Sequence, residues 1–296
     1  MSTVSPTDPP GAAGAGLTEQ VLASLAGAPD PRVRLLLESL VRHAHAFVRE
    51  VGLTEPEWQA GIDFLTHCGQ ITDDRRQEVV LLSDVLGLSM LTIAVNEPTG
   101  TAATEATVFG PFFLEGSPEV GIGGDVAAGV AGRPCWFEGT IRELGGQPVV
   151  GARVDVWEAD EAGLYDVQYG DDRVAARGHL FTDDEGRYAF WGVTPTPYPI
   201  PHDGPVGDLL EAAGRGPMRP AHVHLMVTAT GFRRLVTHVF VRGDPHQDSD
   251  AVFGVKQSLV VDFVEHPAGT RAPDGRDPDL GWASARFDVA LHPVAT

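Results

Sequence analysis

Apolar positions in the first third of the chain recur with the spacing of helices. Between residues 33 and 48 they fall three or four residues apart, which places them along one face of a helix. Asp30, just before this stretch, suits an N-cap, and Pro31 suits the first helical position. The pattern therefore predicts a helix that begins at residue 31.

Two more helices follow in the same part of the chain. Thr54 and Glu57 match a capping box at the start of the second helix, which we expect to end near Gly69. A third helix is predicted for residues 72–95, which are apolar on more than one face and should be buried. Together the helices predict a bundle whose wide apolar faces could also serve a dimer.

After Pro98 the pattern changes to short β-rich runs separated by glycine, proline and acidic turns. Residues 183–186 predict a hairpin turn, and residues 208–213 predict one or two helical turns. Many short strands of this kind favour an antiparallel sandwich or barrel. The predicted strands are residues 135–142, 149–157, 179–182, 188–191, 222–229, 235–241, 258–264 and 286–291.

These patterns divide the chain into three segments. Residues 1–16 are rich in small and turn-forming side chains, and we expect them to be a disordered tail. Residues 17–105 are predicted to form a helical domain, and residues 106–296 a domain with antiparallel β-sandwich architecture. The predicted fold class is therefore α+β.

Composition and charge exclude several classes of protein. The chain has 296 residues, of which 43% are hydrophobic and 21% charged, as in ordinary globular proteins. Its formal net charge of −20 argues against nucleic acid or an anionic membrane as the main partner. We see neither a secretory signal nor an uninterrupted apolar stretch that could span a bilayer, so we expect a cytoplasmic protein.

Common local catalytic motifs are absent from the sequence. There is no GxSxG elbow, no P-loop, no GxGxxG fingerprint and no HExxH motif. The two cysteines form neither a disulfide framework nor a zinc pattern. The absences favour chemistry carried by a metal, or by a site whose residues are far apart in the sequence.

Two histidine pairs have the form HxH, but only one can chelate an ion. His43 and His45 are predicted on a helix, where residues two apart point in different directions. His222 and His224 are predicted on a strand, where both face one side while the apolar residues between and after them face the core. The strand pair is either a metal half-site or two satisfied strand histidines.

The residue types alone do not identify the remaining ligands of such a site. A carboxylate such as Asp244 or Asp248 would complete an Fe(II) or Zn(II) site. Alternatively, Tyr165 follows a strand, and Tyr198 lies in a proline-stiffened loop. Tyrosinate becomes favourable beside a hard trivalent cation, because the cation lowers the high pKa of the phenol.

Several segments together resemble one enzyme family. They are Leu164-Tyr165-Asp166, Pro197-Tyr198-Pro199-Ile200-Pro201, Arg219-Pro220-Ala221-His222-Val223-His224 and the stretch from Asp183 to Phe190. In this order and spacing they are similar to the intradiol ring-cleavage dioxygenases, and the resemblance covers nearly the whole chain after the tail. It implies a helical dimerisation domain followed by a β-sandwich catalytic domain.

The resemblance also implies a cofactor and roles for four ligands. One non-haem Fe(III) per subunit would be bound, with Tyr165 and His222 as equatorial ligands and Tyr198 and His224 as axial ligands. Tyr198 would serve first as a ligand and then as a base. Arg219 would lie over the substrate ring and stabilise negative charge as the ring reacts.

The implied substrates are O2 and a small aromatic diol or triol, most of all hydroxyquinol (1,2,4-trihydroxybenzene), with catechol or chlorocatechol as alternatives. Asp84 would bind the third hydroxyl of hydroxyquinol, or else contact Arg75 or Arg76 within its own helical region. Besides Arg219, the resemblance assigns the pocket to Leu81, Asp84, Val108, Gly110, Pro111, Phe112, Ile200, Pro201 and Val252.

The remaining implications concern partners and one unassigned histidine. Relatives pair through the helical region, often around a phospholipid, so we expect a homodimer that could bind such a lipid. His238 stands where catechol-cleaving relatives often carry glutamine, and it would support Arg219, line the pocket or pack in the core. A competing hypothesis without catalysis is a prealbumin-like binding module, which residues 149–156 and 184–190 resemble.

Overall fold

The computed structural model describes residues 15–73, 75–98, 100–171, 173–276, 278 and 281–294. The chain divides into two compact units, the first ending at His67 and the second beginning at Cys68. The predicted tail lies outside the described residues, except that residues 15 and 16 begin α1 (Ala15–Ser24). The predicted domain boundary at residue 105 stays a prediction.

Both predicted helix starts of the N-terminal unit are confirmed. In α2 (Pro31–Val51), the Asp30 carboxylate accepts hydrogen bonds from the backbone N–H groups of Arg32 and Val33, at 2.7 and 3.2 Å. At α3 (Glu55–Gln70), the Glu57 carboxylate accepts from Thr54 N at 2.9 Å, and Thr54 Oγ1 accepts from Glu57 N at 3.4 Å. These bonds satisfy N–H groups that a helix start leaves without partners.

Helix α2 is amphipathic, yet none of its residues is buried. Its apolar side chains are exposed within the chain and lie three or four residues apart, so that they form one face. They include Val33, Leu36, Leu37, Leu40, Phe47, Val48 and Val51. A large uncovered apolar face of this kind marks an interaction surface.

The third predicted helix is two helices rather than one. α4 (Glu78–Val85) and α5 (Leu88–Asn96) are bent by 71° at the break between them. The single-helix prediction is wrong because Gly87 adopts a left-handed backbone, with φ +71°, that ends the first helix. The expected burial is found for Leu81, Asp84 and Val85 of α4, whereas α5 buries only Met90.

No single helix of the described chain is long and apolar enough to cross a bilayer, although α4 and α5 taken together would pass by length and composition alone.

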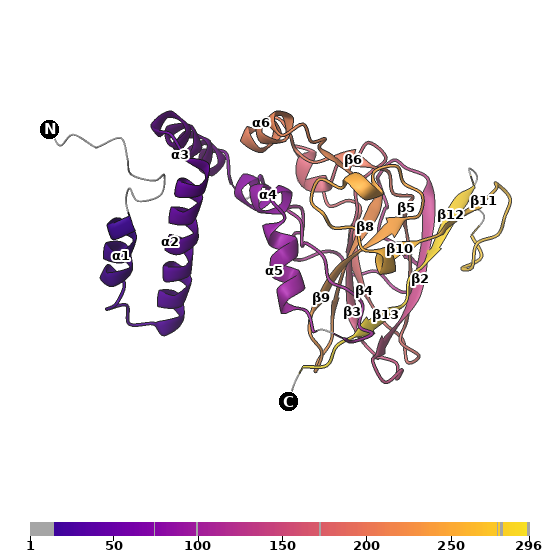
Figure 1. Cartoon of the computed structure of the whole chain (residues 1–296). Helices are drawn as coiled ribbons and strands as arrows, with labels where there is room; N and C mark the ends of the chain where they lie inside the picture. Colours follow the sequence, from indigo (N-terminus) through magenta and orange to yellow (C-terminus); the bar gives the residue numbers. More distant parts are fainter. Residues whose placement is uncertain are drawn as a thin grey trace. The chain divides into compact units, whose positions relative to one another are not determined.

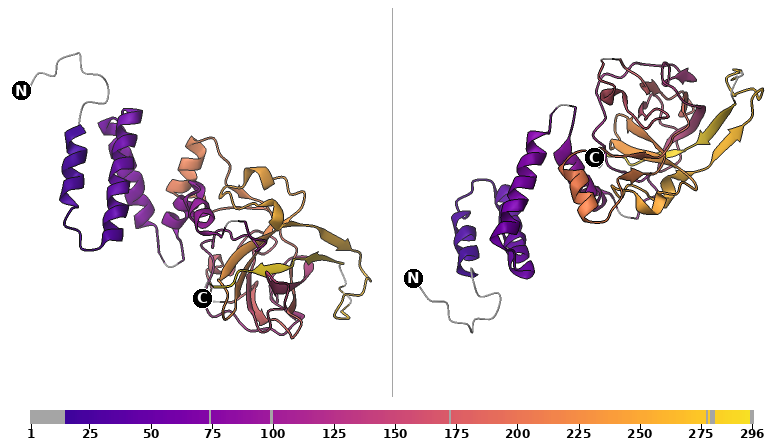
Figure 2. Two further views of the ribbon diagram at one scale, coloured as in Figure 1. Left: turned by 60° about the horizontal axis from the view of Figure 1, so that its bottom comes forward. Right: turned by 90° about the horizontal axis from the view of Figure 1, so that it is seen from above.

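Among its described residues, the second unit contains three sheets and, besides α4 and α5, the α-helix α6 (Pro205–Ala212) (Figures 1 and 2). The first sheet contains β1 (Gly124–Asp125), β5 (Arg187–Val193), β2 (Pro134–Glu143), β12 (Trp282–Arg286) and β11 (Phe263–His266), with β13 (Val289–Leu291) also paired to β2. The second contains β10 (Val260–Val261), β9 (Leu235–Val241), β8 (His222–Thr228), β3 (Arg153–Trp157) and β4 (Arg177–Phe181). The third pairs β6 (Tyr198–Pro199) with β7 (Met218–Arg219).

The predicted α+β class is confirmed, but the sheets are mixed rather than strictly antiparallel. β1 pairs with β5, β10 with β9, and both β12 and β13 with β2 in parallel. Each of these pairs joins strands that are not linked by a hairpin, and only such connections permit parallel pairing. Two predicted strands also break in two: residues 258–264 contain β10 and the start of β11, and residues 286–291 contain the end of β12 and all of β13.

The predicted hairpin at residues 183–186 is a tight turn, but it does not join neighbouring strands of one sheet. It connects β4 of the second sheet to β5 of the first. The Asp183 carboxylate accepts from the backbone of Glu185 and Arg187, and Gly186 takes φ +72°. The predicted turn is therefore confirmed, whereas the crossing between the two sheets depends on the tertiary packing.

Side chains of the two large sheets meet in one hydrophobic core. Val223, Leu225 and Val227 of β8 contribute from the second sheet, and Phe137 and Phe190 contribute from the first. The two phenyl rings stack with centroids 4.9 Å apart. Because side chains alternate along a strand, this core leaves His222 and His224 on the other face of β8, as predicted.

Glu158, immediately after β3, is a buried carboxyl group that links the two sheets. Its Oε1 accepts from the backbone N–H of Val193 in β5 at 3.0 Å, whereas its Oε2 has no hydrogen-bond partner. Burial raises the pKa of Glu158 from 4.5 to about 8. The folded protein therefore holds this side chain protonated at neutral pH.

We predict that Glu158→Gln changes the pH dependence of stability. Between pH 4.5 and about 8 the unfolded chain releases this proton and the folded chain retains it. The wild type should therefore lose stability with rising pH, by about 3 kcal/mol at pH 7. Thermal melts from pH 4 to 8 should show the melting temperature of the variant rising relative to wild type. The exposed control Glu211→Gln should show no such trend, and parallel curves for Glu158→Gln and wild type would refute the assignment.

Candidate metal centre

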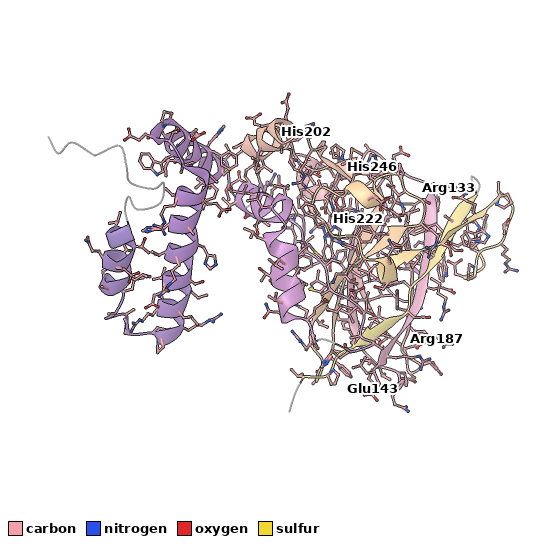
Figure 3. The ribbon with its side chains drawn as sticks, viewed as in Figure 1. Arg133, Glu143, Arg187, His202, His222 and His246 are labelled. Carbon is pink, nitrogen blue, oxygen red and sulfur yellow. The ribbon has the colours of Figure 1, made fainter. Side chains whose placement is uncertain are left out.

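Four short elements bring the predicted ligand residues together. His222 and His224 lie on β8, and Tyr198 on β6 lies opposite Arg219 on β7. Tyr165 directly precedes a short 3-10 helix (Asp166–Gln168). Figure 3 places His222 among the strands of the second unit, well away from Glu143 and Arg187.

The four side chains converge through their polar atoms. The hydroxyl oxygens of Tyr165 and Tyr198 are 3.0 Å apart, and Tyr198 Oη lies 3.2 Å from His222 Nε2. His222 Nε2 in turn lies 3.3 Å from His224 Nε2. All four side chains are buried. Ligands bonded to one metal at about 2 Å lie roughly 3 Å from one another, so two phenols and two imidazoles fit a single ion.

Hydrogen bonds on the far side orient both imidazoles. His222 Nδ1 lies 2.6 Å from the carbonyl oxygen of Pro220 and must donate to it, which makes Nε2 the acceptor nitrogen of the ring and directs its lone pair into the site. His224 Nδ1 lies 2.8 Å from His238 Nε2, and its ring stacks on Trp157 with centroids 4.7 Å apart. Metal-bound histidines are typically held through their second nitrogen in this way.

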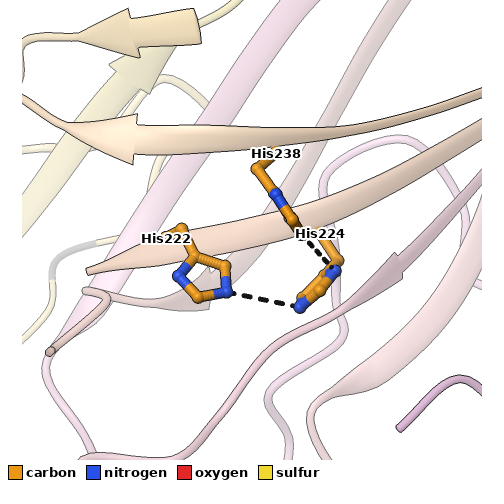
Figure 4. Close-up of side chains that lie close together, drawn as sticks. All are labelled: His222, His224 and His238. Atoms are coloured by element: carbon orange, nitrogen blue, oxygen red, sulfur yellow. Dashed lines mark hydrogen bonds between the residues drawn. The ribbon is translucent and has the colours of Figure 1, made fainter. Parts of the chain in front are cut away.

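His238, whose role the sequence left open, is fully buried and lies opposite His224 in the pairing of β8 with β9. Of the described His, Cys, Asp and Glu residues, only His222, His224 and His238 form a cluster of three that could hold a metal. Figure 4 shows, however, that His238 approaches His224 on the side opposite His222. We therefore assign His238 to orienting His224 rather than to the ligand set.

The same geometry decides between the two ligand sets considered from sequence. No described carboxylate forms a cluster with the histidines. Asp244 instead accepts from the backbone N–H groups of Ala221 and His246, at 3.0 and 2.8 Å, and Asp248 is exposed. The structure thus favours tyrosine over carboxylate as the partner of His222 and His224.

Burial favours the uncharged form of all four side chains. Burial, reinforced by the positive charge of Arg219, lowers the pKa of His222 to about 3. Burial and the neighbouring His222 also lower the pKa of His224 well below its usual value, so both imidazoles are neutral at neutral pH. Burial raises the pKa of Tyr165 and of Tyr198. The two phenols therefore need a bound cation to become phenolates.

Arg219 is held in the site by a carboxylate that the sequence analysis missed. Its Nε donates to Asp250 Oδ1 at 3.1 Å, and its Nη1 lies 3.0 Å from His222 Nε2. Burial is the largest single effect on Arg219 and would lower its pKa, but Asp250 together with Tyr198 and Tyr165 outweighs burial, so the pKa is raised. Asp250 also accepts from the backbone of Val252 and Gly254. No local motif marks Asp250, which lies 31 residues after Arg219.

A cavity of about 410 Å³ lies beside the residues that flank the two tyrosines, including Gly163, Leu164 and Pro199. This volume is in the range of small-molecule sites. Five predicted pocket residues line it: Leu81, Pro111, Phe112, Ile200 and Pro201. Phe112 also stacks on Tyr165, with ring centroids 4.5 Å apart.

The other predicted pocket residues do not line this cavity. Gly110, with φ +74°, packs so close to His224 that a Cβ there would lie 3.2 Å from Cε1 of the imidazole. Val108 and Val252 are buried. None of these three, nor Arg219 or Asp84, lines the cavity.

Asp84 lies on the buried side of α4 and is only 3% exposed. Burial raises the pKa of Asp84, against a smaller opposing effect of its hydrogen bond with Ser89, and the charges of Arg219 and Asp250 also act on it. Arg76, one of its two predicted partners, pairs instead with Glu78 and Asp203. The carboxyl group therefore lies within electrostatic reach of the Arg219–Asp250 pair.

Comparison with known families agrees with this geometry. Residues 120–293 match the family model described as dioxygenase, and residues 30–104 match the model described as catechol dioxygenase N terminus. The protein belongs to this family, the intradiol ring-cleavage dioxygenases, and is an enzyme of that class. Because the chain belongs to this family of enzymes, the alternative hypothesis of a non-catalytic binding module is wrong.

Three relatives show which members of the family the chain is similar to. It is 59% identical to hydroxyquinol 1,2-dioxygenase of Nocardioides simplex, over 94% of this chain and 95% of the relative. It is 60% identical to the enzyme of the same name from Rhodococcus opacus, over 94% and 93%. The solved structure of hydroxyquinol 1,2-dioxygenase from Pseudomonas putida DLL-E4 superposes with a TM-score of 0.86 at 45% identity, covering 94% of this chain and 98% of that one.

We predict that His238→Gln and His224→Gln differ in metal content. In His238→Gln the new amide would still offer a side-chain oxygen to the His224 N–H, so the metal affinity should fall by about ten- to a hundredfold at most. His224→Gln removes a candidate ligand, so this variant should lose most of the metal. Elemental analysis after supplying excess metal checks this, and an equal loss in both variants would show that His238 is itself a ligand.

Proposed function

We propose that Tyr165, Tyr198, His222 and His224 bind one Fe(III) per subunit. The observation that supports this most directly is the convergence of their four polar atoms at spacings of 3.0–3.3 Å in a buried site. Two phenolates carry enough negative charge to favour a hard trivalent ion over a divalent one in a low-dielectric site.

The proposed reaction is intradiol cleavage of hydroxyquinol to a ring-opened hydroxymuconate or maleylacetate, with both atoms of O2 entering the product. The names of the similar relatives support this substrate, and catechol or chlorocatechol is the alternative. When bound, Fe(III) would withdraw electron density from the chelated diolate and make the ring reactive toward O2.

Tyr198 is the proposed base. As a phenolate it can accept a proton from the incoming diol, and the neutral phenol can then hydrogen-bond to Tyr165 Oη, 3.0 Å away. The positive charge of Arg219 partly opposes the effect of burial on the pKa of Tyr198 and so favours the phenolate before substrate binds. The prolines on either side of Tyr198 restrict the loop and hold the side chain at the site.

Arg219 is proposed to stabilise negative charge on the substrate ring. The ion pair with Asp250 fixes its Nε, while Nη1 reaches the immediate neighbourhood of His222. A guanidinium cannot be deprotonated at physiological pH, so its charge is available throughout the reaction. Because the buried position excludes water, the electrostatic interaction of this charge with the substrate is stronger than it would be at the surface.

Specificity is proposed to come from the walls around the diol. Leu81, Pro111, Phe112, Ile200 and Pro201 would enclose the ring, since they line the cavity. The remaining members of the proposed pocket are Asp84, Val108, Gly110 and Val252. Asp84 is the one carboxyl group among them, and it would accept a hydrogen bond from the third hydroxyl of hydroxyquinol.

We predict that Asp84→Asn lowers the preference for hydroxyquinol over catechol. A hydrogen bond to a charged acceptor that is weakened by about 1–2 kcal/mol corresponds to roughly a five- to thirtyfold fall in the ratio of the two kcat/KM values. Steady-state kinetics on both substrates measure the ratio, with Asp208→Asn on the exposed side of α6 as the control. A ratio equal to that of wild type would remove Asp84 from substrate recognition.

The proposed metal centre is tested by a visible absorption spectrum of the purified protein. Tyrosinate bound to Fe(III) should give a charge-transfer band that colours the protein, and anaerobic hydroxyquinol should shift the band. With air admitted, O2 uptake should match the substrate consumed. A colourless protein containing stoichiometric iron or zinc would contradict the tyrosine ligands, and failure to bind iron after reconstitution would contradict the site.

The proposal extends to the arrangement of the chain. We propose that the two large sheets form the β-sandwich of a catalytic domain and that the N-terminal helices form a homodimer. The exposed apolar face of α2 supports the dimer, because side chains such as Leu40 and Phe47 remain 64% and 54% exposed in the single chain. A phospholipid at the dimer interface and a cytoplasmic location stay predictions.

A further inference from the structure

Helix α4 carries one wall of the proposed pocket, through Leu81, and the carboxyl group of Asp84. It has only eight residues. Helices this short are unstable by themselves and take their position from tertiary contacts. Whatever holds α4 therefore determines where Leu81 and Asp84 lie relative to the substrate.

Contacts with α6 and the residues after it hold α4 at both ends, and the two helices lie side by side in both views of Figure 2. At the N-terminal end, Glu78 Oε1 accepts from the backbone N–H of Val206, in the first turn of α6, at 3.0 Å. At the C-terminal end, Arg215 Nη1 donates to the carbonyl oxygen of Val85 at 2.6 Å. That carbonyl is one of the four that a helix end leaves without partners, and a cation there is also favoured by the helix dipole.

Arg215 also binds the loop that holds the catalytic-site arginine. Its Nη2 donates to the carbonyl oxygen of Ala251 at 2.9 Å, next to Asp250, the partner of Arg219. Its guanidinium lies 4.7 Å from the ring centroid of Phe253. One side chain therefore links α4 to the loop of residues 250–253.

The backbone beside these contacts is unusual at Phe253. Phe253 has φ +58°, a conformation that non-glycine residues rarely adopt. Its ring packs against Gly87, where an added Cβ would lie 3.5 Å from Phe253 Cδ2. The bend that ends α4 and the strained loop thus meet beside Arg215, and such strain persists only where the surrounding structure enforces it.

We infer that Arg215 is a positioning residue for substrate specificity. By binding Val85 and Ala251 together, it sets the distance between Asp84 on α4 and the Arg219–Asp250 pair. Both groups act on the substrate in the proposed function, on which this inference rests. Loss of Arg215 should release the C-terminal end of α4 while leaving the four ligand residues in place.

The test compares Arg215→Met with Arg215→Lys and a control, Arg142→Met. Methionine replaces the stem of the arginine side chain as far as Nε but cannot donate, whereas lysine can still donate to one of the two carbonyls. Arg142 also donates to a carbonyl, that of Gly146 at 3.0 Å, and it lies next to Glu143, at the end of the sheets away from His222 (Figure 3). All variants should show the iron content of wild type.

Amide hydrogen exchange gives a readout that does not depend on activity. Arg215→Met should exchange about tenfold faster in peptides covering residues 82–87 and 250–254, with β8 and β9 unchanged. Arg215→Lys should fall between Arg215→Met and wild type, and Arg142→Met should match wild type in both segments. Unchanged exchange in Arg215→Met would overturn the role of Arg215 in holding α4.

Kinetics then test the consequence for specificity. In Arg215→Met the ratio of kcat/KM for hydroxyquinol to that for catechol should fall about fivefold or more, mainly through a higher KM for hydroxyquinol, and lysine should restore part of it. An unchanged ratio, or an equal loss on both substrates, would overturn the specificity role. If wild type cleaves neither diol, the proposed function fails and the specificity role with it, while hydrogen exchange still decides whether Arg215 holds α4.

Discussion

The alternation of side chains along β8 is the constraint on which the site depends. One face of the strand supplies Val223, Leu225 and Val227 to the core between the two large sheets. Because the strand period is two residues, the other face must present His222 and His224 together. A shift of one residue in register would place imidazoles in the core and valines in the site. The stability of the fold and the geometry of the proposed metal centre therefore depend on the same strand.

Desolvation explains why the site should bind a cation. Burial keeps both imidazoles neutral and makes both phenols hard to ionise. The polar atoms that converge in the site lie only 3.0–3.3 Å from one another and from Arg219 Nη1. An ion that exchanges phenolic protons for metal bonds relieves this unfavourable burial, which connects the electrostatics of the site to the iron chemistry proposed for it.

The pocket depends on a different kind of support. The proposed metal ligands lie on or beside strands of a packed core, whereas the wall of the proposed pocket includes the short helix α4. Glu78 holds one end of that helix by accepting a hydrogen bond from the first turn of α6. Arg215, which follows α6 in the chain, holds the other end by donating to Val85. A rigid centre with a separately supported wall would allow specificity to change while the chemistry is conserved.

The sequence alone determined those features of the protein that depend on local patterns. The starts of α2 and α3, the strand that holds His222 and His224, and the turn at Asp183 all follow from caps, periodicity and turn chemistry within a few residues. The order of the tyrosine and histidine segments was enough to recognise the family. Each of these signals is short-range or linear, so it can be read without coordinates.

Only the tertiary structure decided how these pieces meet. It showed that the sheets are mixed, that Gly87 divides the third helix, and that His238 holds His224 rather than Arg219. It also revealed Asp250, Glu158 and Arg215, whose partners lie 31, 35 and 130 residues away in the chain. Contacts over such distances depend on packing between elements, and neither periodicity nor a local motif records them.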